Sequence, residues 1–278
     1  MKTILITGAT SGIGLEAAQQ IAAEGDRLVL VGRNPGKLAE AAELVRAAGA
    51  GGVDTLECDF ASQTSVRQLA KAILAQYDRI DVLANNAGGY HQQRTETEDG
   101  IEATFAVNHL GGFLLTELLL DLMLRSAPAR IVFTSSVLHF GSTLDFDDLG
   151  FRHGYSGEKA YSRSKLANVL YAQSLAHRLE GTGVTANAFH PGAVATNIWD
   201  SVPWFGQPLV AIAKRLFMIS AADGGRALTR VATDPEFADV SGCYIQGNRI
   251  KTPSRHAQDD AIRQQLCAVS ATLVGLPE

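Results

Sequence analysis

Two tyrosine–lysine pairs lie close together in the stretch YSGEKAYSRSK, residues 155–165. Tyr155 precedes Lys159 by four residues, and Tyr161 precedes Lys165 by four. Residues at this spacing differ by only about 40° around a helix axis, so each pair would share one helix face. A lysine ammonium favours the phenolate form of a nearby tyrosine and lowers its pKa from about 10. Such a pair is therefore suited to acid–base chemistry near neutral pH.

The second pair is the stronger candidate. Two glycines bracket Tyr155 and weaken a helix there by roughly 1 kcal/mol each relative to alanine, whereas an amphipathic helical pattern follows Tyr161. On one continuous helix the two tyrosines, six residues apart, would point in different directions. We predict that Tyr161 and Lys165 face the substrate, and that the first pair belongs to a mobile loop beside the substrate entrance.

A glycine-rich loop, TGATSGIG (residues 7–14), follows the first strand-like run and opens a helical one. Glycine lets the backbone approach a phosphate closely, and a helix N-terminus offers N–H donors and a positive dipole end. The spacing G-x-x-x-G-x-G differs from the commonest dinucleotide fingerprint and lacks the G-K-[ST] of a P-loop. The loop predicts a nucleotide-phosphate site, with an ordinary glycine-rich turn as the alternative.

Strand-like and helix-like segments alternate along the chain. The runs ILI, LVLV and IVF are continuously apolar, which is typical of strands buried on both faces of a parallel sheet. Pro35 suits a first helical turn and Ser62 an N-cap. This order predicts an α/β fold, a doubly wound parallel sheet of the Rossmann type, in a single domain over residues 1–278. Residues 199–230, rich in aromatic residues and proline, predict an inserted helical substrate lid.

Composition excludes several classes of protein and partner. The net charge is −5 and the basic residues are scattered, so no nucleic-acid partner is expected. The three cysteines, Cys58, Cys243 and Cys267, are odd in number and far apart, which argues against disulfides and metal sites and for a reducing cytoplasm.

Membrane insertion is not expected either. The N-terminal apolar run is too short for a secretory signal, and the apolar stretch 109–124 is interrupted by Glu117 and Asp121. We expect a cytoplasmic protein with no integral membrane segment. The apolar helices 110–124 and 166–179 favour a homo-oligomer, a dimer or a tetramer. Residues 208–219 are amphipathic, so membrane docking is an alternative to a lid there.

The residues that follow the second strand-like run bear on which dinucleotide the glycine loop would bind. Folds that prefer NAD place an acidic residue there, about 20 residues beyond the glycine loop, on the ribose 2′-hydroxyl. This chain has Gly32 at that position and Arg33 beside it. A guanidinium can bind a 2′-phosphate through paired, charge-assisted hydrogen bonds. The pattern predicts NADP(H) over NAD(H), with a solvated surface arginine as the alternative for Arg33.

Six motifs together resemble the short-chain dehydrogenase/reductase family. In chain order they are TGATSGIG (7–14), NNAG (85–88), VNHLGGF (107–113), FTSS (133–136), YSRSKLAN (161–168) and HPGAVATN (190–197). The resemblance extends from Thr3 to about Cys243. Within the family the chain is most similar to the retinol-dehydrogenase and WW-domain-oxidoreductase-like branch.

The resemblance implies four catalytic residues, Asn108, Ser136, Tyr161 and Lys165. Tyr161 would exchange a proton with the substrate oxygen, which Ser136 would hold, and Asn108 would bind a proton-relay water. Ser135 is the neighbouring alternative to Ser136, and by the family pattern the second serine carries the role. His139 and His153, in the stretch before Tyr161, are expected to be polar loop residues.

The implied activity is hydride transfer between NADP(H) and an apolar alcohol or its ketone or aldehyde; a non-catalytic NADP(H)-binding sensor or scaffold is the alternative. Asp59 would contact the adenine edge and Asn85 the adenosine ribose, although both could instead cap strand ends. The expected cofactor-binding residues are Gly8, Ser11, Gly12, Ile13, Gly14, Arg33, Asp59, Asn85, Ala87, Gly88, Tyr161, Lys165, Pro191, Gly192 and Thr196.

Overall fold

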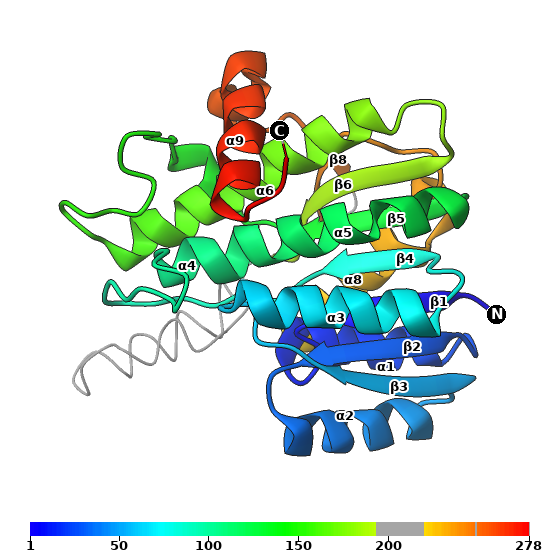
Figure 1. Ribbon diagram of the computed structural model, residues 1–278. Coiled ribbons are helices and arrows are strands. Elements are labelled where there is room, and N and C mark those ends of the chain that lie inside the picture. Colours follow the sequence, from blue (N-terminus) through cyan, green and yellow to red (C-terminus); the bar gives the residue numbers. More distant parts are fainter. Residues whose placement is uncertain (193–219, 248, 278) are drawn as a thin grey trace.

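The computed structural model describes residues 1–192, 220–247 and 249–277. Its strands form one sheet in the order β3-β2-β1-β4-β5-β6-β7-β8 (Figure 1). All neighbouring strands are parallel except β7 and β8, which are antiparallel. The strands are β1 (Thr3–Thr7), β2 (Arg27–Gly32), β3 (Gly52–Glu57), β4 (Val82–Asn85), β5 (Ala129–Thr134), β6 (Val184–His190), β7 (Tyr244–Gln246) and β8 (Arg249–Lys251). The predicted doubly wound sheet is confirmed.

Helices cover both faces of the sheet. The side chain of Leu5 in β1 packs into the cluster formed with α3, α5 and α6, while Ile4 and Ile6 pack on α1, α2 and α8. All three β1 side chains are fully buried, which explains the continuous apolar runs. The helices are α1 (Gly12–Ala22), α2 (Pro35–Ala47), α3 (Gln63–Gln76), α4 (Ala103–Phe105), η1 (Ala106–Leu110), α5 (Gly111–Arg125), η2 (Val137–Gly141), α6 (Gly157–Arg178), α8 (Ala221–Thr233), η4 (Pro235–Phe237), η5 (Arg255–Gln258) and α9 (Asp260–Leu273).

The apolar stretch of the chain lies in a longer helical segment than the sequence suggested. Helices α4, η1 and α5 run together over Ala103–Arg125, which by length and composition alone would suffice to cross a membrane. Within the fold, 61% of its most apolar part is buried, because α5 packs on the sheet beside α3. The segment is a core helix of this fold.

The C-terminal part of the predicted lid belongs to the sheet layers instead. Residues 221–230 lie in α8, which packs closely along α1 and also touches β4, β5 and β6. Gly225 permits the contact, since an added Cβ would lie 2.6 Å from the Cβ of Glu16. The predicted range 199–230 is therefore wrong at its C-terminal end. Residues 199–219 lie outside the described part of the chain.

The C-terminal helix α9 crosses α6 (Figure 1). The tail after α9 is fastened to α3, because Arg67 and Gln63 donate hydrogen bonds to the carbonyls of Val274 and Leu273. Apolar residues of α6 from Leu166 to Leu175 are fully buried within the single chain. Their apolar character is accounted for without a second subunit, so oligomerisation stays a prediction.

Candidate active site

The glycine loop after β1 forms a cradle that side chains would fill. Gly8 and Gly12 have φ angles of +67° and +54°, in the left-handed region that favours glycine. A Cβ added to Gly14, in the first turn of α1, would lie 2.3 Å from the carbonyl oxygen of Gly8. The loop backbone therefore approaches the start of α1 as closely as a phosphate-binding turn requires.

A hydrogen-bonded clamp joins this loop to the end of β4. The Thr7 hydroxyl accepts hydrogen bonds from the backbone N–H groups of Asn86 and Ala87, both at 2.9 Å. The Asn86 side-chain amide donates to the Thr7 carbonyl at 3.0 Å. Sequence reasoning did not single out Asn86; the second asparagine of NNAG was the available signal.

A cleft of about 560 Å³ opens at this edge of the sheet. It brings together eight of the predicted cofactor-binding residues, Gly8, Ser11, Gly12, Ile13, Arg33, Asp59, Ala87 and Gly88. Thr10, Asn86, Gly89, Tyr90 and His91 also line it, and none of them was predicted. The carboxyl edge of a parallel sheet is where dinucleotides bind in this architecture.

The side chain of Asn85 lies away from the cleft, which corrects its expected place beside the ribose. Its amide donates a hydrogen bond to the Thr116 hydroxyl in α5 at 2.9 Å. Successive side chains of a strand point to opposite faces, so Asn86 reaches the glycine loop while Asn85 faces the α5 layer. Asn85 therefore links the sheet to α5.

Asp59 lies where both expectations for it stay open, and its adenine contact stays a prediction. It lines the cleft, and its carboxylate also accepts the backbone N–H of Ala61 at 3.0 Å, which caps its own loop.

Arg33 is exposed at the rim of the cleft, directly after β2. Gly32 is fully surrounded: an added Cβ would lie 2.5 Å from Cγ2 of Thr10 and 3.2 Å from Cδ2 of Leu38. A side chain at the position where NAD-preferring folds carry an acid would thus require Thr10 to move. Arg33 instead brings a guanidinium to the part of the cleft that lies directly after β2.

Helix α6 begins between the two tyrosines. Ser156 is its N-cap, so Tyr161 lies on the helix and Tyr155 precedes it. The Tyr155 hydroxyl donates a hydrogen bond to the carbonyl of His91 at 2.8 Å and lies 3.3 Å from a carboxylate oxygen of Glu102. These bonds correct the expectation of a mobile loop, because they fasten Tyr155 to the segment before α4.

Lys165 lies one turn beyond Tyr161 and is buried. Its Nζ is 5.3 Å from the centroid of the Tyr161 ring and donates a hydrogen bond to the Thr134 carbonyl at 3.1 Å. A Cβ added to Gly88 would lie 3.3 Å from this Nζ. Because the backbone of NNAG packs directly on the lysine, cleft and lysine form one site.

The pKa values of the pair differ from the sequence-based expectation. Burial raises the pKa of Tyr161 to about 12, and a hydrogen bond with Ser136 opposes the rise. Burial lowers the pKa of Lys165 to about 8. The direction is opposite to the predicted lowering of the Tyr161 pKa by Lys165, because withdrawal of the phenol from water is the largest influence on it.

The two serines at the end of β5 have different surroundings. The Ser135 hydroxyl donates to the backbone carbonyl of Lys165 at 2.8 Å, which holds β5 against α6. The Ser136 hydroxyl accepts the backbone N–H of Leu138 at 3.2 Å, and it lies near enough to Tyr161 to oppose the rise of the pKa of that residue. Of the two, Ser136 is the one beside the Tyr161 hydroxyl.

His139 is a buried core residue, which corrects its assignment to a polar loop. Its Nε2 accepts the backbone N–H of Ser254 at 3.2 Å, so Nδ1 carries the proton and donates to the Ser136 carbonyl at 2.7 Å. His153 is exposed, as expected.

Asn108 lies in the single π-helical turn η1, a feature often found at functional sites. Its side-chain oxygen accepts the Gly89 N–H at 2.7 Å, while its amide donates to the Gly89 carbonyl at 2.9 Å and to the Ser164 hydroxyl at 3.0 Å. The side chain thus fixes the NNAG segment against α6. The expected relay water stays a prediction.

The family model described as short chain dehydrogenase matches residues 2–204. The chain belongs to the short-chain dehydrogenase family. Retinol dehydrogenase 14 of Mus musculus is 41% identical over 99% of this chain and 86% of its own length. The proposed daunorubicin C-13 ketoreductase DnrU of Streptomyces sp. (strain C5) is also 41% identical, over 99% of this chain and 93% of its own. These relatives place the chain in the retinol-dehydrogenase branch.

A solved structure, the RhlG/NADP active-site complex of Pseudomonas aeruginosa, has a TM-score of 0.71 to this short-chain dehydrogenase. It is 25% identical and covers 89% of this chain and 94% of its own. The likeness extends over most of both chains and supports the Rossmann-type fold.

The last predicted cofactor residues of this short-chain dehydrogenase follow β6. Pro191 and Gly192 line a second cavity of about 670 Å³ together with Val137 and His190. Gly192 has a φ of +106°, which favours glycine. Thr196 lies outside the described residues.

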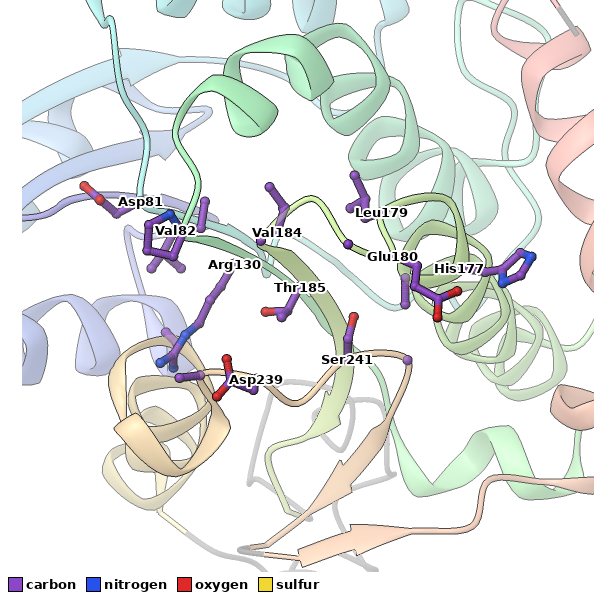
Figure 2. Close-up of a pocket in the computed structure, with 18 of the residues that line it drawn as sticks. Asp81, Val82, Arg130, His177, Leu179, Glu180, Val184, Thr185, Asp239 and Ser241 are labelled. Carbon is purple, nitrogen blue, oxygen red and sulfur yellow. The ribbon is translucent and has the colours of Figure 1, made fainter.

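A larger cavity, about 800 Å³, lies at the opposite edge of the sheet, where β4, β5 and β6 begin (Figure 2). Its charged lining is mixed in sign and includes Arg130 and Asp239. The Arg130 guanidinium donates to the carbonyls of Val231 and Asp234 at the end of α8, so it serves as a helix cap. This cavity holds neither Tyr161 nor Lys165, the predicted catalytic pair, which lies at the other edge of the sheet. Across residues 1–192, 220–247 and 249–277, no group of three side chains is arranged to hold a metal ion.

Proposed function

We propose that the protein is an NADP(H)-dependent oxidoreductase that interconverts an apolar alcohol and its ketone or aldehyde. The observation that carries the proposal is the convergence of three groups: the Tyr161 hydroxyl, the nearby Ser136 hydroxyl, and the buried ammonium of Lys165. They adjoin a glycine-lined cleft at the carboxyl edge of the sheet.

The cleft fits a dinucleotide phosphate. Backbone at Gly8, Gly12 and Gly14 would receive the pyrophosphate at the N-terminus of α1. Arg33 would bind the 2′-phosphate of NADP(H), and an acid at the crowded Gly32, which would favour NAD(H), would have to displace Thr10. The likeness to a structure titled as an NADP complex supports the same choice.

The bound nicotinamide would supply or accept a hydride. Ser136 would hold the substrate oxygen, and Tyr161 would exchange a proton with that oxygen. With a pKa of about 12, Tyr161 is protonated near neutral pH, which is the form needed to donate a proton when a carbonyl is reduced. Lys165, protonated below pH about 8, would stabilise the phenolate that remains.

An apolar substrate fits the surroundings of Ser136. Leu138 and Phe140 lie in η2, the short helix that Ser136 caps, and they are 41% and 47% exposed. Relatives named for retinol and for a daunorubicin ketone agree with this class. Exposed apolar side chains beside a reacting hydroxyl would favour a substrate with an apolar body.

NADPH oxidation with a panel of retinoid, polyketide and simple aromatic carbonyl compounds tests the proposal. Turnover of at least one compound, abolished in Tyr161→Phe, would support it. Tight NADPH binding with no turnover on any compound would favour a cofactor-binding sensor instead.

The proposed setting is the cytoplasm, with no integral membrane segment and with a homo-oligomer as the assembly. Cell fractionation would test the location, liposome pelleting the membrane docking of residues 208–219, and sedimentation equilibrium the oligomeric state. A single species at the 29.6 kDa of one chain would overturn the oligomer.

A further inference from the structure

Asn168 lies on α6, three residues after Lys165, and is buried. Its side-chain amide donates two hydrogen bonds to backbone carbonyls, one to Asn108 at 2.9 Å and one to Thr134 at 3.1 Å. The Thr134 carbonyl also accepts the hydrogen bond from Lys165 Nζ. Asn168 therefore shares its acceptor with the lysine and also binds the main chain of another predicted catalytic residue.

These bonds fix the orientation of the Asn168 amide. Turning the amide over would set its oxygen against two carbonyl oxygens, neither of which can donate. The Asn168 oxygen must therefore be an acceptor, and it lies 3.2 Å from Nδ1 of His109. It follows that His109 carries its proton on Nδ1 and donates to Asn168.

His109 is in turn bonded to the C-terminal helix. Its Nε2, which must then be an acceptor, lies 3.0 Å from the hydroxyl of Ser270 in α9. The imidazole is 1% exposed, and its ring lies within 6.2 Å, centroid to centroid, of three aromatic rings, those of Phe105, Phe113 and Tyr171. Burial lowers the His109 pKa to about 4, so the ring is neutral near pH 7. The three hydrogen bonds then run in one direction: Ser270 donates to His109, His109 donates to Asn168, and Asn168 donates to the Thr134 carbonyl.

We propose that Ser270, His109 and Asn168 form a directed hydrogen-bond chain. Through it the C-terminal helix α9 fixes the carbonyls of Thr134 and Asn108 beside Lys165. In this proposal His109 and Asn168 are positioning residues for the reaction. The catalytic part of this inference rests on the proposed function. Small displacements of reacting groups lower the rate strongly, and the Thr134 carbonyl holds the ammonium of Lys165 directly. The hydrogen-bond chain therefore affects the reaction through the position of Lys165 and does not itself contact the substrate.

The tautomer of His109 tests the chain without any assay of activity. In the full-length protein with ¹⁵N-labelled histidine, the His109 resonances are assigned by their loss in His109→Asn. We expect a protonated Nδ1 and an unprotonated, acceptor-type Nε2, unchanged between about pH 6 and pH 8. A proton on Nε2, or a ring that titrates in this range, would overturn the chain.

Kinetics of matched variants test the positioning role. An asparagine at 109 can set its amide nitrogen near the place of Nδ1 and keep the bond to Asn168, whereas leucine removes both bonds. We expect His109→Leu and Asn168→Leu to lower kcat about tenfold or more, with the KM for NADPH within about twofold and with His109→Asn recovering most of the loss. Wild-type kcat in both leucine variants would overturn the role.

Ser270→Ala keeps the test decisive if the leucine variants do not fold, because it removes one hydroxyl from a helix that retains its packing. A kcat lowered about threefold at unchanged KM for NADPH is expected; a lowered Tm with wild-type kcat would show a merely structural role. If wild-type protein turns over no substrate, the proposed function fails while the tautomer still decides the chain.

Discussion

The ammonium nitrogen of Lys165 lies 5.3 Å from the centroid of the Tyr161 ring. Burial raises the pKa of the tyrosine and lowers the pKa of the lysine, so the two values move apart and the lysine titrates first. In solution a tyrosine and a lysine titrate at nearly the same pH. Here the lysine, with a pKa of about 8, loses its proton well before the tyrosine, with a pKa of about 12. Below pH 8 the pair therefore holds a neutral phenol beside an ammonium, which is the state suited to donate a proton to a carbonyl oxygen.

Tyr161→Phe should lower kcat for carbonyl reduction by roughly 10²–10⁴-fold, because it removes the acid and nothing else. The Kd for NADPH, measured by fluorescence titration, should change by less than about threefold, since the glycine loop and Arg33 are untouched. A variant that kept more than about a tenth of the wild-type rate would contradict the role of Tyr161.

Tyr155→Phe is the matched control. It removes a hydroxyl that donates to the His91 carbonyl at 2.8 Å, so we expect a loss of about 1 kcal/mol in the free energy of unfolding and near-wild-type turnover. Urea denaturation and steady-state kinetics separate the two effects. Loss of turnover in Tyr155→Phe would reverse the assignment of the two pairs.

Lys165→Met should abolish turnover and yet stabilise the fold below pH 8. In wild type the lysine is protonated there in both folded and unfolded chains, and the folded chain bears the full burial penalty. Between about pH 8 and pH 10.5 the unfolded chain holds more protons, so the free energy of unfolding of wild type rises with pH through that window. The Thr134 carbonyl keeps its bond from Asn168 in the variant.

We therefore expect the free energy of unfolding of Lys165→Met to exceed that of wild type by about 1–3 kcal/mol at pH 7, and the difference to vanish by about pH 10.5. Urea denaturation at a series of pH values measures both quantities. An excess that grew with rising pH would show that the lysine is not buried as a charge.

Arg33→Asp should shift cofactor preference toward NAD, because a carboxylate repels the 2′-phosphate that the guanidinium would bind. We expect the ratio of kcat/KM for NADPH to that for NADH to fall roughly 10- to 100-fold or more. Lys71→Asp, which changes the charge equally on the exposed face of α3 away from the cleft, is the control. An equal effect of both variants would attribute the shift to net charge alone.

Gly225→Ala should destabilise the protein, because the added methyl group would lie 2.6 Å from the Cβ of Glu16 and 2.9 Å from the backbone nitrogen of Ala17. Overpacking of this kind typically costs about 1–3 kcal/mol. Gly36→Ala, in the exposed first turn of α2, should leave Tm nearly unchanged. A Gly225→Ala variant with wild-type Tm but an altered KM for substrate would instead indicate that α8 is part of the substrate lid.

The elements whose chemistry is local could be predicted from sequence. Helix α2 begins at Pro35 and Ser62 caps α3, because proline conformation and side-chain capping act within a few residues. The cleft could be predicted because the glycine motif directly follows a buried strand, and parallel topology then fixes which sheet edge it occupies.

Features that depend on packing between distant segments could not be predicted. Which of two consecutive asparagines faces the loop depends on the pleat of β4, so Asn85 was chosen where Asn86 lies. The amphipathic residues 221–230 would look alike in a lid and in a helix on the sheet. Burial of His139 follows from Ser254, 115 residues away, and the raised pKa of Tyr161 follows from its surroundings.

The crowding at Gly32 also limits how this enzyme can evolve or be redesigned. In this architecture an acidic residue after the second strand binds the ribose 2′-hydroxyl of the non-phosphorylated cofactor. Here a carboxylate at that position would first meet Thr10 in the glycine loop, so the loop would have to change before the strand end could. We therefore expect a route to the non-phosphorylated cofactor to begin at Thr10 or at Arg33 rather than at residue 32.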